Sequence, residues 1–365
     1  MMNRINLEDL LPRNPIELDR KEIADYLRNK VVLITGAAGS IGSELSRQIA
    51  KYAPRLMILI DFAETPLHNL LLEMKKRFPE LESIPILTSI TDKRNLELVF
   101  GLYRPQVVFH AAAYKHVPMM ESFPAKAVQN NCMGTRIVAD LAVKFGVGKF
   151  VMISSDKAVN PTNVMGCSKR ICEIYCQALD KSTGHQTQFV TTRFGNVLGS
   201  NGGVIPIFME QLREGGPLTV THPDIVRFFM LIPEACELVL QACTLGKGGE
   251  IFVFDMGRQV RIADLAQRMI DLSGLKGIEI VYTGLRNGEK LFEEVLNQEE
   301  TTLPTTNPKI KVAKVREYEF GEVLRNELAL EELSYHSGEF NIVRKMKDIV
   351  PEYKSKHSKY EILDS

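Results

Sequence analysis

Val31-Val32-Leu33-Ile34-Thr35-Gly36-Ala37-Ala38-Gly39-Ser40-Ile41-Gly42 is the stretch of sequence that decides the fold. Its first five residues predict a buried parallel strand, and the residues that follow the glycines predict a helix through Ala50. The spacing GxxGxxG lets the chain turn tightly and lets a pyrophosphate approach the amides at the helix N-terminus. The stretch therefore predicts a dinucleotide site formed by Gly36, Gly39, Ser40, Ile41 and Gly42.

A carboxylate follows at the position that this kind of site requires. The next predicted strand, residues 56–60, ends at Asp61, nineteen positions after Gly42. A carboxylate there would accept hydrogen bonds from the adenosine ribose and repel a 2′-phosphate, so it favours NAD over NADP. A tight turn with an exposed aspartate is the alternative interpretation.

Strands and helices continue to alternate, which is typical of an α/β fold with a Rossmann-like, doubly wound parallel sheet. We expect further strands at 84–88, 107–110, 149–153 and 189–193, and helices at 21–27, 64–77, 93–100, 125–145 and 168–179. After about residue 200, prolines interrupt the alternation. The predicted organisation is an N-terminal arm (1–30), a dinucleotide-binding domain (31–200), a smaller C-terminal lobe (201–352, with about 250–256 returning to the main sheet) and a mobile polar tail (353–365).

The composition excludes several classes of partner. Lys and Arg together number 45, as do Asp and Glu, so the net charge is zero and neither nucleic acid nor an anionic membrane is indicated. The six cysteines lack ligand spacing, so we expect no metal and reduced thiols in a cytoplasmic protein. No apolar run has the length of a membrane span, so no membrane contact by this chain is expected.

Reactive side chains gather where the strand at 149–153 ends. Ser155, Asp156 and Lys157 follow it directly, at the edge of the sheet where α/β proteins bind ligands. A solvated ion pair in a loop is the alternative. After the strand at 107–110, the small residues Ala111, Ala112 and Ala113 would let a cofactor pass close to the backbone, and Lys115 is a candidate ligand contact.

Six motifs in order resemble a known family. They are TGAAGSIGSE (35–44), HAAAYKHVP (110–118), SSDKAVNPTNVMGCSK (154–169), RFGNVLGSNGGVIP (193–206), THPDIVRFFM (221–230) and GLRNGEKLFEE (284–294). Together they resemble the extended short-chain dehydrogenase/reductases of polysaccharide biosynthesis, and most closely the UDP-N-acetylglucosamine 4,6-dehydratases. The resemblance implies a sheet of about seven strands, a lobe that binds the sugar nucleotide, and tightly held NAD.

The resemblance also implies a reaction. NAD-dependent oxidation at C4 of the hexose is followed by loss of water across C5 and C6 and by return of hydride to C6, which makes the chain a hydro-lyase. Lys157 matches the base that removes the C5 proton, and for this it must be neutral, with its pKa lowered by burial and by nearby positive charge. Asp156 matches the acid for the departing 6-hydroxyl, with a raised pKa. Ser155 matches the hydroxyl that bonds the 4-hydroxyl.

One position departs from the general superfamily pattern. The tyrosine expected four residues before Lys169 is Met165, as in the methionine-containing subgroup that the chain resembles. Methionine cannot accept a proton, so Asp156, a water or a relay through Ser155 remains open as acceptor of the 4-hydroxyl proton. Lys169 would still bond the nicotinamide ribose.

The remaining site residues are also implied by the resemblance. Asn131 would contact the cofactor, and the residues expected to contact the UDP-sugar are Lys115, Asn196, Arg227, Arg286 and Glu289. The opening Leu7–Asp19 resembles a linker that follows a membrane portion, so a missing membrane domain and a place at the cytoplasmic face of the inner membrane are considered. A homo-oligomer is expected.

Several functions stay open at this point. The leading prediction is a 4,6-dehydratase of UDP-N-acetylglucosamine that retains configuration at C5, in surface polysaccharide, capsule or glycan biosynthesis. A 5-inverting dehydratase and a UDP-N-acetylhexosamine 4-epimerase are the enzyme alternatives. A non-catalytic NAD-binding regulator is the alternative of another class, supported by the missing tyrosine and opposed by the presence of Asp156 and Lys157 together.

Overall fold

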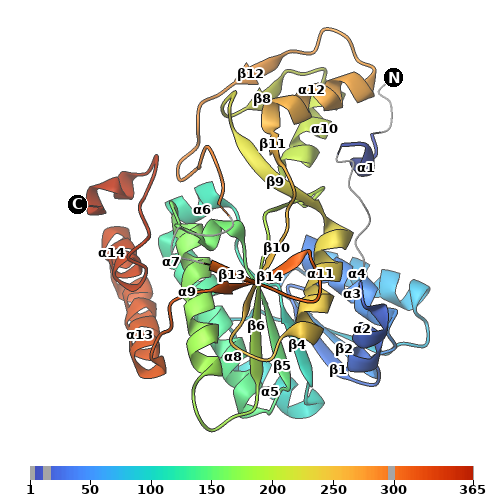
Figure 1. Ribbon diagram of the computed structural model, residues 1–365, viewed down its shortest axis with the longest axis vertical. Coiled ribbons are helices and arrows are strands. Elements are labelled where there is room, and N and C mark those ends of the chain that lie inside the picture. The colour runs from blue at the N-terminus through green and yellow to red at the C-terminus, as the bar shows by residue number, and fades with distance from the viewer. Residues whose placement is uncertain (1–4, 11–17, 295–300, 365) are drawn as a thin grey trace.

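The computed structural model describes residues 5–10, 18–294 and 301–364, and within them lies a sheet of nine strands in the order β13-β14-β10-β6-β5-β4-β1-β2-β3 (Figure 1). The strands are β1 (Val31–Thr35), β2 (Leu56–Asp61), β3 (Ser83–Leu87), β4 (Val107–His110), β5 (Lys149–Ile153), β6 (Gln188–Arg193), β10 (Ile251–Phe254), β13 (Thr301–Pro304) and β14 (Ile310–Lys314). From β3 to β10 the strands run parallel, which confirms the predicted doubly wound sheet. The antiparallel hairpin β13–β14 extends its edge and was not predicted from the sequence.

The order of the sheet reverses at β1. This strand pairs with β2 on one side and with β4 on the other, so the loops that follow β1 and β4 separate at that point. Alternate residues of β1 enter two cores, Val31 and Leu33 on one face and Val32 and Ile34 on the other. In an open α/β sheet a ligand binds in the crevice that opens at such a reversal.

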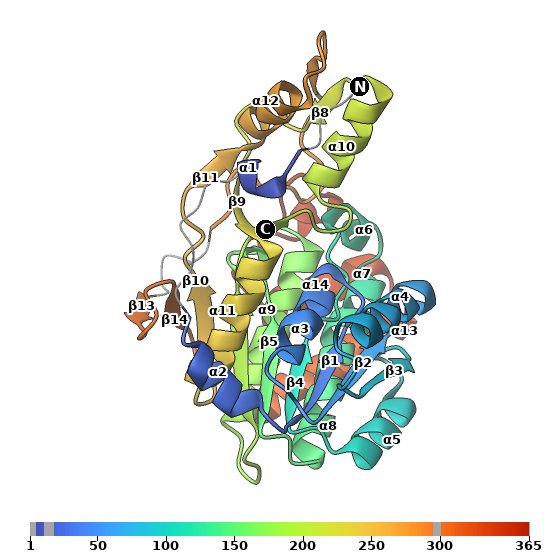
Figure 2. The same ribbon diagram turned by 90° about the vertical axis from the view of Figure 1, so that its right-hand side faces the viewer.

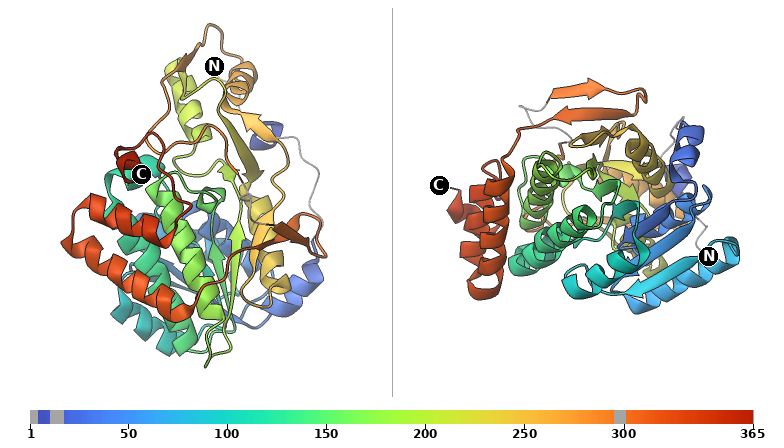
Figure 3. Two further views of the ribbon diagram at one scale, coloured as in Figure 1. Left: turned by 60° about the vertical axis from the view of Figure 1, so that its left-hand side comes forward. Right: turned by 90° about the horizontal axis from the view of Figure 1, so that it is seen from below.

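Helices cover both faces of the sheet. Those on one face are α2 (Arg20–Leu27), α3 (Ser40–Ala50), α4 (Glu64–Arg77) and α11 (Ile232–Leu245), seen together in Figure 2. Those on the other face are α5 (Lys93–Tyr103), α8 (Gly134–Lys144) and α9 (Val164–Asp180). An outer pair, α13 (Phe320–His336) and α14 (Glu339–Ile349), packs against α9 (Figure 3).

Two predicted helices have different limits in the structure. The helix predicted at 125–145 is divided into α7 (Pro124–Ala127), a π-helical turn η1 (Val128–Met133) and α8. The helix predicted from residue 168 begins four residues earlier, because the Asn163 side chain caps it by accepting a hydrogen bond from the Gly166 N–H at 2.7 Å. The earlier start places Met165 and Lys169 in one helix, four residues apart, so both can face the same side.

A small lobe, residues 196–231 and 259–294, stands over the carboxyl ends of the parallel strands (Figure 1). Its elements are β7 (Asn196–Leu198), α10 (Val204–Glu214), β8 (Leu218–Val220), β9 (Val226–Leu231), β11 (Gln259–Arg261), α12 (Ile262–Ser273) and β12 (Ile280–Tyr282). They enclose a separate core around Phe208 and Met269. The lobe predicted at 201–352 takes only part of that range, because α11, β10, β14, α13 and α14 pack on the main sheet.

The described segments near the two ends of the chain, 5–10 and 353–364, both pack against the rest of the protein. The short helix α1 (Leu7–Leu10) buries Leu10 in the core of the small lobe. The tail after Glu352, predicted to be mobile, buries Tyr353 and Tyr360 and forms the 3-10 helix η3 (Lys359–Leu363). These aromatic rings give the polar tail an apolar anchor, which its overall composition conceals. No helix in the described ranges combines the length and apolar content needed to cross a bilayer.

Candidate active site

A cavity of about 1010 Å³ lies between the ends of the parallel strands and the small lobe. It brings together most of the residues predicted from the sequence. Those that line it are Gly36, Gly39, Ser40, Ile41, Gly42, Ala111, Ala113, Lys115, Ser155, Lys157, Met165, Lys169, Asn196, Arg227, Arg286 and Glu289. Four predicted residues, Asp61, Ala112, Asn131 and Asp156, lie outside this lining.

The glycine-rich loop is packed so tightly that only glycine fits at two positions. Gly36 has φ +64°, and a Cβ there would lie 2.7 Å from the Ala112 backbone. A Cβ at Gly42 would lie 2.1 Å from the Gly36 carbonyl oxygen. The N-terminus of α3 borders the cavity, and the glycines leave its backbone open to the close approach that a bound pyrophosphate requires.

Asp61 and Asn131 hold the loops that border the cavity. The Asp61 carboxylate accepts the Ala38 N–H and the Ala63 N–H, each at 2.9 Å, and so ties β2 to the glycine-rich loop. The Asn131 side chain lies in the π-helical turn and accepts the Tyr114 N–H at 2.8 Å, while it donates to the Tyr114 carbonyl at 3.0 Å. Asn131 thus holds the loop after β4 in place, and its predicted contact with the cofactor stays a prediction.

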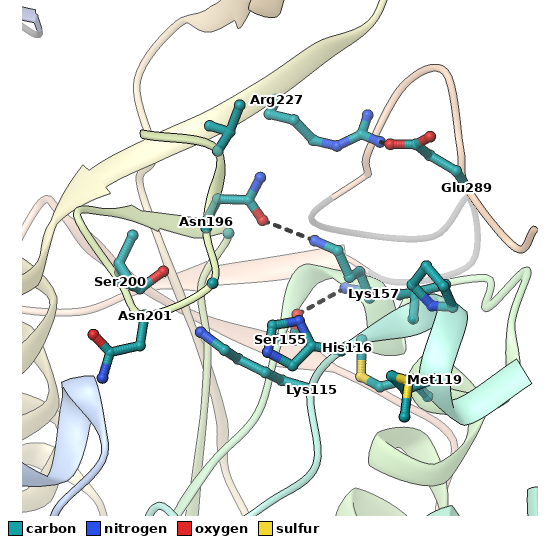
Figure 4. A pocket seen from close by; sticks show the side chains of 18 of the residues that line it. Lys115, His116, Met119, Ser155, Lys157, Asn196, Ser200, Asn201, Arg227 and Glu289 are labelled. Carbon is teal, nitrogen blue, oxygen red and sulfur yellow. Dashed lines mark hydrogen bonds and ion pairs between the residues drawn. The ribbon is translucent and has the colours of Figure 1, made fainter. Parts of the chain in front are cut away.

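Of the predicted catalytic residues, Asp156 and Lys157 lie in the short 3-10 helix η2 (Asp156–Ala158) that follows β5, and Ser155 caps its N-terminus. The Ser155 hydroxyl accepts the Lys157 N–H at 3.2 Å and donates to Asp156 Oδ1 at 2.9 Å. Asp156 is fully buried, and its Oδ2 has no hydrogen-bond partner among the described residues. Ser155 and Lys157 therefore face the cavity (Figure 4), whereas Asp156 does not line it.

Lys157 is held as an ammonium ion. Its Nζ donates to Asn196 Oδ1 at 3.0 Å and to Asp156 Oδ1 at 3.1 Å, and it lies 3.5 Å from Glu293 Oε1. Burial opposes the charge, but the carboxylates of Asp156 and Glu293 outweigh burial and hold the pKa of Lys157 above its ordinary value. The prediction of a lowered pKa for this lysine is wrong for the structure as it stands, because a carboxylate from a distant segment was not foreseen.

Lys169 has the opposite environment. Its Nζ donates to the Ile153 carbonyl at 3.0 Å, and burial lowers its pKa. Beneath it, burial and the charge of Lys169 lower the pKa of His110 to about 3, so this histidine is neutral and bonds Thr35 and Thr135 at 2.8 and 2.9 Å. Met165 is buried against the cavity, and its thioether leaves no proton acceptor at the position of the missing tyrosine.

The arginines of the small lobe share carboxylates with one another and with Lys157. Glu289 Oε1 accepts from Arg286 at 3.2 Å and from Arg227 at 3.4 Å. Glu293 Oε1 lies 3.7 Å from Arg227 Nε. Lys115 is exposed and its side chain extends toward Ser200 and Asn201 (Figure 4). Glu293 was not predicted from the sequence. It stands beside Glu294 in a loop without periodicity, so the pattern does not indicate which way its side chain points.

The C-terminal tail closes the back of the site and was also missed. The Lys354 and Lys356 N–H groups donate to the carbonyls of Pro161 and Thr162, and the Lys356 carbonyl accepts the Gly288 N–H at 3.0 Å. The tail thereby joins the loop that precedes α9 to the loop that carries Glu289 and Glu293. Only buried Tyr353 and Tyr360 in an otherwise polar segment signal this role.

The chain is similar to proteins of polysaccharide biosynthesis. A family model described as "Polysaccharide biosynthesis protein" matches residues 32–315. The capsular polysaccharide biosynthesis protein CapD of Staphylococcus aureus is 48% identical over 320 residues, which are 87% of this chain and 53% of CapD. The chain thus spans about half the length of that curated relative.

Two further similarities extend the comparison. The UDP-glucose 4-epimerase of Rickettsia canadensis is 35% identical over 284 residues, which are 74% of this chain and 79% of that protein. Among solved structures, Pen from Bacillus thuringiensis matches with a TM-score of 0.74 at 31% identity, covering 79% of this chain and 90% of Pen. Of these similar proteins, one is named for capsular polysaccharide biosynthesis and another for epimerisation of a sugar nucleotide.

Proposed function

The chain belongs to the polysaccharide biosynthesis protein family, and from that premise we propose that it is an NAD-dependent UDP-N-acetylglucosamine 4,6-dehydratase. The product would be a UDP-4-keto-6-deoxy-N-acetylhexosamine that retains configuration at C5. One observation carries the proposal. A lysine bonded to a buried aspartate lines the same cavity as a glycine-rich helix N-terminus and two arginines of the small lobe.

The residues of the glycine-rich loop fit NAD. A Cβ at Gly36 or Gly42 would fill the space beside the backbone, so the glycines leave the close approach that a pyrophosphate needs. Asp61 uses its two oxygens to hold Ala38 and Ala63, and each oxygen keeps a lone pair for a ribose hydroxyl. When bound, NAD would supply reversible hydride transfer, from C4 at the start and to C6 at the end.

Lys157 and Asp156 together can supply the base and the acid that elimination needs. In the ion pair, the ammonium lies 3.1 Å from Asp156 Oδ1. Transfer of one proton along this hydrogen bond yields a neutral amine and a protonated carboxyl group, the two forms that remove the C5 proton and protonate the departing 6-hydroxyl. A closed, desolvated site favours this neutral pair over two charges.

Because Asp156 does not line the cavity, its proton must reach the substrate through a neighbour. Ser155 faces the cavity and donates to the same Oδ1 atom, so its hydroxyl connects the buried carboxyl group with the hexose. A carboxyl group that has taken the Lys157 proton cannot also take the proton of the 4-hydroxyl. We therefore assign to Ser155 the transfer of the Asp156 proton to the departing 6-hydroxyl, and to a water molecule the acceptance of the 4-hydroxyl proton.

The small lobe would bind the UDP moiety. Arg227 and Arg286 line the cavity and share Glu289, so both guanidinium groups are oriented before a diphosphate arrives. Asn196 is better suited to hold Lys157 than the sugar, because its amide oxygen already accepts from Nζ. Homo-oligomerisation and a cytoplasmic location also belong to this proposal.

A UDP-N-acetylhexosamine 4-epimerase is the second candidate, favoured by the similarity to the UDP-glucose 4-epimerase of Rickettsia canadensis. Epimerisation needs no elimination, so it would leave the pairing of Lys157 with Asp156 without a purpose. A 5-inverting dehydratase would use the same pair and differs only in the face on which C5 is reprotonated. A regulator without turnover would need neither side chain.

Incubation of the protein with UDP-N-acetylglucosamine, followed by NMR of the product, separates these functions. A 6-methyl doublet with a 4-keto hydrate supports dehydration, and the ring coupling at C5 reports retention or inversion. A UDP-N-acetylgalactosamine spectrum would identify an epimerase and reject the proposal, and an unchanged substrate would favour the regulator.

A lysine variant tests the assigned base. Lys157→Met should lower turnover by roughly 10²–10⁴-fold while bound NAD, measured after denaturation, stays at the wild-type content. Lys75→Met, an exposed lysine on α4, is the matched control and should keep full turnover. Wild-type turnover in the Lys157→Met variant would remove the lysine from the mechanism.

A further inference from the structure

Glu293 is a buried carboxylate that joins two cations of the site. Only 4% of the residue is exposed, and it lines the cavity. Its Oε1 lies 3.5 Å from Lys157 Nζ and 3.7 Å from Arg227 Nε. Its other oxygen, Oε2, is buried and has no hydrogen-bond partner among the described residues. A carboxylate with one oxygen left without such a partner is costly to bury, and its two cationic neighbours are the evident compensation.

The charges that face Lys157 from the described residues come from three elements. Asp156 belongs to η2, Arg227 to β9, and Lys290 and Glu293 to the loop 284–294. Asn196, on β7, contributes a neutral oxygen. Lys290 is turned away, with its Nζ donating to the Val159 carbonyl at 2.9 Å. Lys157 therefore has two carboxylates within 3.5 Å, although the proton transfer to Asp156 requires only one.

We propose that Glu293 is a positioning residue that holds Lys157 against Asn196 and sets the pH at which this lysine becomes a free amine. Through Oε1, Glu293 also connects Lys157 to Arg227. The small lobe therefore determines both the position and the charge of Lys157, which follows strand β5 of the main sheet. Asp156 lies beneath Lys157 and cannot hold the amine from the side of the small lobe.

The direction of the effect follows from the sign of the charge. A carboxylate at 3.5 Å stabilises the ammonium form, so removing its charge with Glu293→Gln should lower the pH at which Lys157 loses its proton, by about one unit. Glutamine keeps the shape of glutamate and still offers an acceptor oxygen, so the lysine should stay in place. That pH is the midpoint of the Lys157 titration, and a residue that only supports the fold would not change it.

The role of Lys157 as a base rests on the proposed function, but its titration does not, and it can be measured without substrate. The purified protein is treated with trace acetic anhydride at a series of pH values, and acetylation of the peptide that contains Lys157 is quantified by mass spectrometry. The exposed Lys51 serves as the internal reference. The midpoint for Lys157 should lie above that of Lys51 in the wild-type protein and fall by about one unit in Glu293→Gln.

Two further variants keep the test decisive. Glu294→Gln changes the adjacent carboxylate, which is half exposed and bonded to Asn160, and should leave the midpoint unchanged. Glu293→Asp keeps the charge at a shorter reach and should give a smaller downward shift, which tests the proposal if the glutamine variant does not fold. An unchanged midpoint in both Glu293 variants, or an equal shift in Glu294→Gln, overturns the assignment.

An activity measurement separates this assignment from the function itself. If the wild-type protein forms the dehydrated product, the acidic limb of kcat/KM should move to lower pH in Glu293→Gln by the shift seen in labelling. If the wild-type protein forms no such product, the proposed dehydratase is rejected, and the labelling result still decides whether Glu293 controls Lys157.

Discussion

The cofactor half and the sugar half of the cavity are built from the chain in different ways. The cofactor half consists of β1, β2 and β4 with the loops that follow them, and its contacts join neighbouring parallel strands. Asp61, for example, holds the turn that begins only one strand away. The sugar half joins the loop after β5, the small lobe, the loop 284–294 and the C-terminal tail. Its contact between Ser358 and Glu121 spans 237 positions.

This difference predicts where side chains can be substituted without displacing the residues of the site. In the cofactor half, backbone meets backbone, so geometry is fixed by the absence of side chains at Gly36 and Gly42. In the sugar half, buried carboxylates connect segments, so geometry is fixed by charge and hydrogen bonding. We therefore expect steric substitutions to damage the first half most, and charge substitutions to act on the second.

The largest effect is expected for Gly42→Ala. The new Cβ would lie 2.1 Å from the Gly36 carbonyl oxygen and 2.8 Å from Ala37 Cα, and neither backbone atom can move without displacing the loop. We expect a loss of about 3 kcal/mol in the free energy of unfolding and loss of the bound cofactor. Urea unfolding and the NAD content of the purified protein measure the two effects.

Gly101→Ala provides the matched control for this prediction. Gly101 lies within α5, and its added Cβ would meet only the Phe145 ring at 3.6 Å, an ordinary contact. Alanine favours a helix over glycine, so the variant should be as stable as the wild type or slightly more stable. Full NAD content in Gly42→Ala would show that the cofactor half does not depend on backbone contact.

The same difference explains how much could be predicted from the sequence. The cofactor half follows from short-range patterns: strands are apolar, the turn is glycine-rich and the carboxylate stands one strand later, and the structure has these elements within one or two residues. The sugar half could be predicted only in part. Lys157 and Arg227 lie in the cavity, but the raised pKa of Lys157 depends on Asp156 and also on Glu293, 136 positions away, which no local pattern indicates.

Other missed features have the same cause. Asn131 stands in a segment that reads as continuous helix, and the π-helical turn there directs its amide to the loop after β4. The tail after Glu352 is polar in composition, yet Tyr353 and Tyr360 are buried against segments that lie far away in sequence. Periodicity describes neighbours along the chain, so it does not predict contacts between segments that are far apart in the sequence.

Gly288→Ala tests whether the sugar half also contains a steric position. Gly288 has φ +75°, and an added Cβ would lie 2.7 Å from Asn163 Cβ and 2.9 Å from Val117 Cγ1. We expect a cost of about 2 kcal/mol and a displaced loop 284–294. Turnover should fall while NAD content stays at the wild-type value, because the glycine-rich loop is untouched.

The control for this variant lies in the same loop. Gly284 has φ +88°, but no atom of the described residues lies within 4 Å of an added Cβ, so Gly284→Ala carries the backbone strain without the clash. It should cost about 1 kcal/mol and keep more turnover than Gly288→Ala. Equal losses in the two variants would mean that strain, and not packing against Asn163, governs this loop.

The smallest effect is expected for Glu121→Gln. The Glu121 carboxylate joins the tail to α9, and the substitution replaces one of its two acceptor oxygens with an NH₂ group. Glu121 Oε1 accepts the Val164 N–H and Oε2 accepts the Ser358 hydroxyl, each at 2.6 Å, and an amide can accept only one of these bonds. We expect a loss of about 1 kcal/mol in the free energy of unfolding at low pH, measured by urea unfolding, with Glu80→Gln as an exposed control that changes nothing.

The pH dependence gives this variant its sharper test. Burial outweighs the bonds from Ser358 and Val164 and raises the pKa of Glu121 above its ordinary value. A raised carboxyl pKa means that the folded state prefers the protonated form, so this contribution to stability is complete below the ordinary pKa of glutamate and is lost as the pH rises through the raised one. The stability difference between the wild type and Glu121→Gln should therefore be largest near pH 4 and shrink as the pH increases. A difference that grows with pH would mean that the charge of Glu121 stabilises the junction, and that the sugar half is held together by ion pairing where we infer hydrogen bonding.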